Sequence, residues 1–196
     1  GYGGNLKRIL AIGAKHGGDI FVDLHPDGEY STSGIAPAIE KVKNGSKFVL
    51  GNRFADGNSP YKRGMYWWKV VPLWIMMTID KLVLGVNIND LHQGFRVYTK
   101  DLLKEVSFEN CSNDYLFSFE IITQVIFRKL KIGEVPVDTK YTGEKRGASF
   151  KSSVKYALGT FKILFLFVLA RLGFKTSIFK KPNKSLISRI DSLIRI

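Results

Sequence analysis

Residues 19–30 read DIFVDLHPDGEY, a short apolar run that ends in a turn rich in polar residues. The aromatic and β-branched residues Ile20, Phe21 and Val22 are typical of a buried strand. A loop follows, then a helical pattern over about 33–44 and a second apolar run over 47–50. Strand, helix and strand in this order predict a parallel sheet and the α/β fold class.

The flanking sequence continues this alternation. An amphipathic helix is predicted over 6–15, entered from a glycine-rich loop formed by residues 1–5. Pro136 indicates a strand terminus or a sheet edge, because proline cannot donate a hydrogen bond to a neighbouring strand. Three further elements are predicted: a strand over 94–98, a helix over 118–130 and a strand over 132–137.

A strongly apolar stretch runs from Met65 to Leu84, but Lys69, Pro72 and Asp80 interrupt it. A membrane span needs about 20 largely uninterrupted apolar residues. We therefore predict a helix that is packed on the domain or lies at an interface.

The C-terminal region contains two apolar segments among many cations. Residues 163–170 are uninterrupted and apolar between Lys162 and Arg171, a run that falls short of a bilayer crossing. Residues 184–196 carry one apolar stripe beside basic residues, the pattern of an interfacial helix. A helix packed on the domain or on a partner subunit fits this stripe equally well. The stripe consists of Leu186, Ile187, Ile190, Leu193 and Ile194.

The composition indicates one domain with an anionic partner. Thirty Lys and Arg against seventeen Asp and Glu give a formal net charge of +13, which favours nucleic acid, phospholipid headgroups or a phosphorylated substrate. The single cysteine, Cys111, excludes an internal disulfide and a zinc site built from cysteine clusters. The start at Gly1 shows no signal-peptide pattern and indicates a chain that begins in the middle of a fold.

Three polar side chains follow the first predicted strand at every second position: His25, Asp27 and Glu29. An extended backbone projects them to one side, and ligands of parallel sheets bind at the C-terminal ends of the strands. Such side chains could hold a divalent cation. The alternative is an ordinary turn rich in Pro, Asp and Gly.

Two other features could make contacts with a phosphate-containing ligand. The backbone N–H groups of Gly3, Gly4 and Asn5, next to a helix start, could approach a phosphate or a sugar hydroxyl. Arg53 and Arg96 lie at predicted strand ends, where they could clamp a diphosphate. Loops that bind nothing and surface ion pairs are the alternatives.

Taken together, these motifs resemble the family-2 glycosyltransferases, in particular the dolichyl- and polyprenyl-phosphate sugar synthases and relatives with a His-Pro-Asp metal motif. The resemblance covers about residues 1–160. It rests on six segments in the family's order: 1–5, 24–30, 51–54, 90–96, 133–137 and 147–149.

Two departures accompany the resemblance. Most of the family has Asp-x-Asp where this chain has His25-Pro26-Asp27, so a nitrogen replaces one hard carboxylate ligand. The first part of the family's domain, which holds the base and the ribose, would precede Gly1.

For the fold, the resemblance implies a nucleotide-sugar glycosyltransferase (GT-A-like) α/β fold that lacks its N-terminal strands. We expect a partial catalytic domain over 1–150 and a membrane-surface extension of amphipathic helices over 151–196. The location expected from the resemblance is cytoplasmic, peripheral on the inner face of the membrane, in cell-envelope glycan synthesis.

For the chemistry, the resemblance implies transfer of a sugar from a nucleotide-sugar donor to a polyprenyl phosphate or a glycan hydroxyl, with Mg²⁺ or Mn²⁺ as cofactor. A hydroxyl acceptor needs a carboxylate base, for which Asp90 is the first candidate and Glu120 the second. The fragment alone is expected to be inactive.

The competing hypothesis is a basic module that binds nucleic acid or lipid without catalysis. The charge of +13 and the fourteen Phe residues suggest it. No zinc-finger spacing, RNA-recognition aromatic motif or helix-turn-helix pattern supports nucleic acid as the partner.

Overall fold

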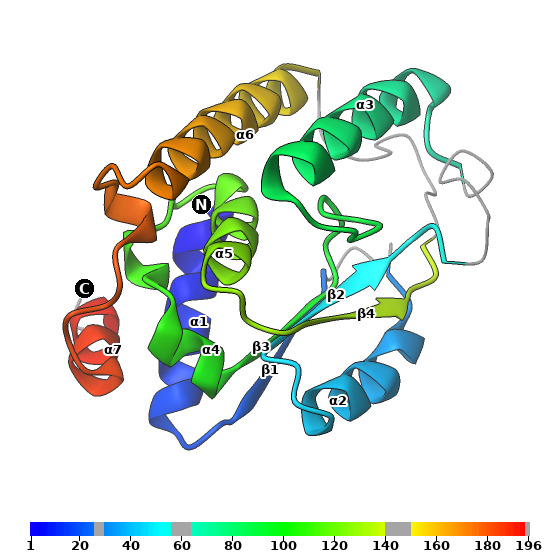
Figure 1. The fold of residues 1–196 in the computed structure, drawn as a ribbon. Helices are drawn as coiled ribbons and strands as arrows, with labels where there is room; N and C mark the ends of the chain where they lie inside the picture. The colour runs from blue at the N-terminus through cyan, green and yellow to red at the C-terminus, as the bar shows by residue number, and fades with distance from the viewer. Residues whose placement is uncertain (26–29, 56–63, 140–149, 195–196) are drawn as a thin grey trace.

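The computed structural model describes residues 1–25, 30–55, 64–139 and 150–194. Their centre is a four-stranded sheet in the order β1-β3-β2-β4 (Figure 1). The strands are β1 (Ile20–Asp23), β2 (Phe48–Asn52), β3 (Arg96–Thr99) and β4 (Ile132–Pro136).

The sheet is mixed. β1 and β2 are not neighbours, because β3 lies between them and is antiparallel to both, whereas β2 and β4 pair in parallel. β1, β2 and β4 therefore share one direction and β3 opposes it. The sequence order predicted the α/β class correctly, but the predicted parallel sheet is mixed, because β3 lies antiparallel between β1 and β2 and local patterns do not determine which strands become neighbours. Pro136 ends β4 at an edge of the sheet, as predicted.

Two layers of helices cover the sheet. Alternate strand residues point to opposite faces, so Phe48 and Tyr98 join the large core with α1, α4 and α5, while Val49 and Val97 join a smaller core with Ala38 of α2. A short 3-10 turn, η2 (Phe108–Asn110), precedes α5, and another, η1 (Thr32–Gly34), leads into α2. The α-helices that cover the two faces of the sheet are α1 (Tyr2–Lys15), α2 (Ile35–Lys43), α4 (Lys100–Glu105) and α5 (Leu116–Phe127).

The glycine-rich segment is not a loop. It forms the first turn of α1, which begins at Tyr2, and it packs closely on residues 112–114. A Cβ on Gly3 would lie 2.4 Å from the Ser112 carbonyl oxygen, and the Gly4 amide donates to the Asn113 carbonyl at 3.1 Å. The glycines therefore permit close helix packing, and the Gly4 amide already has a partner.

Two long helices lie side by side across one end of the molecule (Figure 1): α3 (Trp67–Leu84) and α6 (Phe150–Arg171). The apolar run 163–170 is too short to span by itself, as predicted from the sequence, but it forms the C-terminal part of the longer helix α6. Over Lys151–Arg171, α6 is the one helix in the described residues that is long and apolar enough to cross a bilayer, by length and composition alone.

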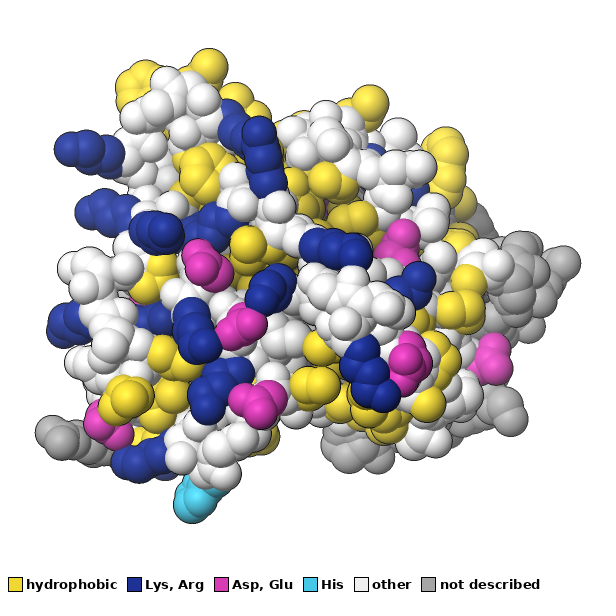
Figure 2. Space-filling model, turned by 60° about the horizontal axis from the view of Figure 1, so that its bottom comes forward, with side chains coloured by type: hydrophobic (Ala, Val, Ile, Leu, Met, Phe, Trp, Pro, Cys, Tyr) yellow, Lys and Arg dark blue, Asp and Glu magenta, His cyan; other side chains and the backbone are white. Residues whose placement is uncertain are grey.

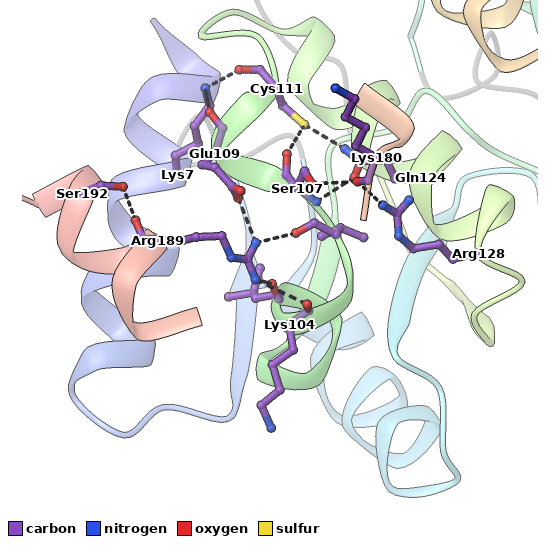
Figure 3. Close-up of polar contacts among 12 residues, drawn as sticks. Lys7, Lys104, Ser107, Glu109, Cys111, Gln124, Arg128, Lys180, Arg189 and Ser192 are labelled. Carbon is purple, nitrogen blue, oxygen red and sulfur yellow. Dashed lines mark hydrogen bonds and ion pairs between the residues drawn. The ribbon is translucent and has the colours of Figure 1, made fainter. Parts of the chain in front are cut away.

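The chain ends with η3 (Ser177–Phe179) and α7 (Leu186–Ile194). Of the two alternatives for the last apolar stripe, the structure shows packing on the domain. α7 lies against α1, and its Ile190 is 3% exposed. The buried Arg189 donates to the carbonyl oxygens of Val106 and Leu103 and pairs with Glu109 (Figure 3). Leu186, Leu193 and Ile194 are partly buried against the core, whereas Ile187 is 72% exposed.

Candidate active site

The predicted site residues that the structure describes, apart from Glu120 and the glycine-rich segment, converge on one edge of the sheet. β1, β2 and β4 end at this edge and β3 begins there, because Asp23 pairs with Arg96 and Asn52 with Pro136. His25 follows β1, Arg53 follows β2, and the segment 90–96 leads into β3. Ligands of α/β proteins commonly bind at such a C-terminal edge. Asp27 and Glu29 lie outside the described residues.

Arg53 and Asp90 form a buried ion pair. Arg53 Nε lies 2.6 Å and Nη2 2.9 Å from the two carboxylate oxygens of Asp90, and the Arg53 amide donates to the same carboxylate at 3.2 Å. The side chains are 5% and 0% exposed. The contact joins the end of β2 to the segment that leads into β3. Both groups are engaged with each other, so their predicted roles as donor ligand and base remain predictions.

His92 connects this segment to both long helices. Its Nε2 lies 2.6 Å from a carboxylate oxygen of Asp80 on α3, and its Nδ1 lies 3.1 Å from the hydroxyl of Tyr156 on α6. The imidazole also stacks on Phe119 of α5. Neither Asp80 nor Tyr156 was a predicted site residue. A signal for Asp80 existed, because a lone carboxylate in an apolar helix needs a buried partner.

Arg96 is a second buried cation at this edge, at 4% exposure. Burial acts to lower the pKa of Arg96, but the neighbouring Asp23 carboxylate, together with the Tyr2 and Tyr98 side chains, outweighs burial, so the pKa is raised. Within the described residues, its Nε has no hydrogen-bond partner. The Tyr2 hydroxyl donates to Asp23 at 2.5 Å, and burial raises the pKa of Tyr2 to about 12.

His25 lies between two tyrosine rings, with centroid distances of 5.6 Å to both Tyr2 and Tyr30. Gly94 permits this arrangement. A Cβ there would lie 3.0 Å from His25 Nε2 and 2.9 Å from the Tyr30 ring, and the Gly94 amide donates to the Tyr30 hydroxyl at 2.7 Å. His25 therefore lies close to Gly94, near the end of the segment 90–96.

Glu120 has a different set of contacts. Its carboxylate accepts from the amide and the hydroxyl of Ser112, at 2.5 and 2.8 Å. Lys7 donates to the carbonyl of Cys111 and, at 2.8 Å, to the side chain of Asn113 in the same loop. Burial raises the pKa of Glu120, which the Ser112 hydrogen bonds and Lys7 oppose. Glu120 thus holds the 109–114 loop against α5, and Lys7 holds it against α1. The role of Glu120 as a second base remains a prediction.

A metal site is not complete in the part of the chain that the structure describes. Within these residues, no group of three or more His, Cys, Asp or Glu side chains comes together. Of the three predicted ligands, His25 lies at the site edge, and the other two fall outside the described ranges. The predicted set therefore rests on sequence.

Comparisons with known proteins agree with this fold. No known family profile matches the chain. Glucosyl-3-phosphoglycerate synthase of M. tuberculosis has a similar structure, with a TM-score of 0.57 at 16% identity, over 90% of this chain and 57% of that chain. The chain has the α/β GT-A fold. At this identity, the likeness concerns the fold alone.

Three curated proteins are similar in sequence. The UDP-N-acetylglucosamine–dolichyl-phosphate N-acetylglucosaminyltransferase of Methanococcus voltae is 30% identical over 86% of this chain and 63% of its own length. The polyprenol monophosphomannose synthase of Mycolicibacterium smegmatis is 24% identical over 77% of this chain and 56% of its own. The undecaprenyl-phosphate mannosyltransferase of Micrococcus luteus is 25% identical over 70% of this chain and 56% of its own length.

The chain is a relative of glycosyltransferases. It spans about 56–63% of the length of these curated relatives. All three names specify a polyprenyl-type phosphate, although the sugar differs between them.

Proposed function

We propose that this chain is part of a family-2 glycosyltransferase that moves a sugar from a nucleotide-sugar to a polyprenyl phosphate at a membrane surface. The observation that carries the proposal is the polyprenyl-type phosphate named in three relatives that each match at least 70% of the chain. It favours a lipid phosphate over a glycan hydroxyl as acceptor. The inner, cytoplasmic face remains the predicted side of the membrane.

The buried Arg53–Asp90 pair is consistent with a phosphate acceptor. In the proposed reaction, an acceptor phosphate oxygen forms a bond to the anomeric carbon. The bond from that carbon to the nucleoside diphosphate breaks, and its electron pair stays on the diphosphate. A phosphate oxygen is already ionised, so it needs no general base. Asp90 can then act by holding Arg53 and the segment 90–96 in place rather than by accepting a proton.

Arg96 supplies positive charge beside the proposed reaction site. A buried guanidinium with an Nε that has no partner in the described residues can donate to an anionic group that enters the edge. Charge develops on the diphosphate as the bond breaks, so fixed positive charge stabilises that change most. This supports the predicted contact between Arg96 and the donor.

A divalent cation, Mg²⁺ or Mn²⁺, is part of the proposal. It would neutralise charge on the diphosphate. His25, which follows the end of β1, is the proposed nitrogen ligand, and Asp27 and Glu29 are the proposed carboxylate ligands. The structurally similar synthase of M. tuberculosis was crystallised with Mn²⁺ and uridine diphosphate.

The test is a transfer assay on the longer protein that contains this chain. Labelled sugar is expected to move from a nucleotide-sugar to a polyprenyl phosphate when Mn²⁺ or Mg²⁺ is present. Asp27→Ala should lower turnover at least about a hundredfold, because a lost metal ligand removes several kcal/mol of leaving-group stabilisation. Transfer to a free glycan hydroxyl but not to the lipid phosphate would contradict the proposed acceptor.

A binding experiment tests the part of the site that this chain holds. By calorimetry, the isolated chain is expected to bind nucleotide-sugars poorly even with Mn²⁺, because it spans only 56–63% of the length of its curated relatives. Micromolar binding would show that the nucleotide sits within this chain.

A further inference from the structure

Tyr115 is an exposed aromatic residue next to the candidate active site. It precedes α5 and is 61% exposed. Its ring stacks on the Tyr2 ring, with a centroid distance of 5.4 Å and an interplanar angle of 19°. The Tyr2 ring lies 5.6 Å from the His25 ring, and the Tyr2 hydroxyl donates to Asp23 at the end of β1. Two ring contacts therefore connect Tyr115 to the proposed metal ligand His25.

Exposure alone does not make Tyr115 a binding residue, because single exposed apolar side chains are common on protein surfaces. The ring is distinguished by what lies behind it. Tyr2 is half-buried and hydrogen-bonded to Asp23, and it covers one face of the Tyr115 ring. The opposite face is left toward solvent, so an aromatic surface is presented at the site edge in a fixed orientation.

The backbone that leads to Tyr115 is held by buried charged side chains. Lys7 of α1 donates to the Cys111 carbonyl (Figure 3), and Glu120 of α5 accepts from the amide and the hydroxyl of Ser112. Lys7 and Glu120 are at most 6% exposed, and buried charges are costly unless their partners are well placed. The loop is therefore ordered before a ligand arrives, which lowers the entropic cost of binding.

Asp114 places a carboxylate next to Tyr115. One of its oxygens accepts from the Leu116 amide at 3.0 Å, and the other lies 3.1 Å from Lys155 Nζ on α6. The side chain is 47% exposed, so the carboxylate is also accessible from solvent. Burial acts to raise the pKa of Asp114, but the Leu116 amide and Lys155 outweigh burial, so the pKa is lowered and the carboxylate is ionised at neutral pH.

A sugar ring matches this pair of side chains better than the other parts of the proposed substrates do. The C–H groups on one face of a pyranose pack against an aromatic ring, and its hydroxyls donate hydrogen bonds to a carboxylate. A diphosphate or a lipid phosphate is anionic and is repelled by an ionised carboxylate. A polyprenyl chain has no donor for it. The pair therefore favours a neutral ligand rich in hydroxyl groups.

The net positive charge of the chain does not point to this place. Figure 2 shows Lys and Arg spread over one face of the molecule, where they outnumber Asp and Glu. At the site edge, the buried Arg96 begins β3, and Tyr2 lies between His25 and Tyr115. The edge thus has one end suited to phosphate, near Arg96 and His25, and another suited to a neutral sugar.

We propose that Tyr115 and Asp114 form the subsite for the transferred sugar. Tyr115 packs on the apolar face of the sugar ring, and Asp114 accepts a hydrogen bond from one of its hydroxyls. This subsite rests on the proposed function, because the sugar arrives as part of the nucleotide-sugar donor. The diphosphate of the donor then extends toward His25 and Arg96.

Donor kinetics in the longer enzyme with Mn²⁺ test the sugar subsite. The probes are the nucleotide-sugar that the wild type transfers and the matching nucleoside diphosphate, which lacks the sugar and is measured as an inhibitor. Tyr115→Ala should raise the KM for the nucleotide-sugar about tenfold, because the stacking surface is lost. The inhibition constant of the diphosphate should change less than about twofold, as for other surface substitutions. Equal weakening of both ligands would overturn the proposal.

Two variants keep a bulky side chain over Tyr2, so they separate stacking on a ligand from packing within the protein. Tyr115→Phe retains the aromatic face and should keep the KM for the nucleotide-sugar within about twofold of wild type. Tyr115→Leu covers Tyr2 without an aromatic face and should raise this KM nearly as much as Tyr115→Ala. A normal KM in Tyr115→Leu would contradict the stacking role. The matched control is Phe174→Ala, which should leave the KM unchanged, because Phe174 is 62% exposed beyond the C-terminal end of α6.

Asp114→Asn tests the carboxylate. The amide oxygen can still accept from the Leu116 amide, because asparagine also caps helix N-termini. The KM for the nucleotide-sugar should rise about fivefold, since hydrogen bonds to an ionised acceptor are about twice as strong as neutral ones. The diphosphate alone should bind as tightly as before or more tightly, because a negative charge is removed. Tighter binding of the nucleotide-sugar would contradict the sugar contact of Asp114.

The outcomes distinguish the subsite from the sugar transfer itself. Transfer with an unchanged KM in both Tyr115→Ala and Asp114→Asn would exclude the subsite and leave the proposed function standing. If Tyr115→Ala raised the KM for polyprenyl phosphate but not for the nucleotide-sugar, Tyr115 would belong to the acceptor site and the subsite would be wrong. A wild-type enzyme that transfers no sugar to polyprenyl phosphate would overturn both the subsite and the proposed function.

Discussion

His92 Nε2 lies 2.6 Å from a carboxylate oxygen of Asp80, and both side chains are almost completely buried. The two residues are twelve positions apart, on the segment before β3 and on α3. A buried carboxylate is costly without a partner, so this contact stabilises the position of the segment 90–96 against α3.

We expect His92→Ala to lower the free energy of unfolding by about 2–4 kcal/mol, because it leaves the Asp80 carboxylate buried without this partner. Tyr156→Phe, which removes only a hydroxyl, should cost about 0.5–1.5 kcal/mol. Urea unfolding is measured for His92→Ala, Tyr156→Phe, Asp80→Asn and the double variant with Asp80→Asn and His92→Ala. The double variant gives the coupling energy between Asp80 and His92. Additive effects of Asp80→Asn and His92→Ala would show that the contact is energetically unimportant.

The Arg53–Asp90 pair gives a second prediction. Asp90→Ala should destabilise the chain by about 3–5 kcal/mol, because it leaves the Arg53 guanidinium buried and unneutralised by this partner. Asp101→Ala is the matched control. Asp101 pairs with Lys47 and Lys104 at an exposed position, where such pairs contribute about 0–1 kcal/mol. In the longer enzyme, Asp90→Asn should lower turnover and spare donor binding. Equal thermal stability of Asp90→Ala and wild type would contradict the role in stability.

Variants of Glu120 distinguish a structural role of this carboxylate from a role as catalytic base. If it holds Ser112, Glu120→Gln should keep turnover within about threefold in the longer enzyme, because the amide oxygen can still accept from the Ser112 amide. Glu120→Ala should cost about 1–3 kcal/mol of stability by leaving a buried donor without a partner. A hundredfold loss of turnover in a fully stable Glu120→Gln enzyme would restore the base hypothesis.

Gly94→Ala should affect the site edge more than the core. The added methyl group would crowd His25 Nε2 and the Tyr30 ring, at 3.0 and 2.9 Å, and overpacking of this kind costs about 1–3 kcal/mol. We expect a larger loss in sugar transfer than in stability, measured on the same preparation. Unchanged transfer would show that the position of His25 is not important for the reaction.

Stability should fall at high pH, because burial raises the pKa of Tyr2, Tyr98 and Tyr156. A raised pKa means that the folded state retains the proton, so this contribution is present below pH 10, the ordinary tyrosine value. It is lost above that value, for Tyr2 as pH approaches about 12. Tyr2→Phe should make the decline less steep in chemical unfolding between pH 9 and about 12. An equal slope would exclude Tyr2 as a contributor.

The sequence alone predicted several elements correctly because their signals are local. β1, the helix around α2, β2 and β4 all follow from periodicity and turn residues within about ten positions. The same patterns predicted that His25, Arg53 and Arg96 lie at strand ends. The common direction of β1, β2 and β4 then brings these residues to one edge of the sheet.

Tertiary structure alone decided the pairing within that edge. Arg53 is 37 positions from Asp90, and Tyr156 is 64 positions from His92, so no local pattern relates them. The same limit applies to α7, whose stripe suited both a membrane and a protein surface. An apolar stripe in the sequence predicts only that one face of the helix is removed from water. Which surface covers that face depends on what the tertiary fold brings next to it. For α7 that surface is α1, whereas apolar side chains of α6 such as Phe165 stay exposed.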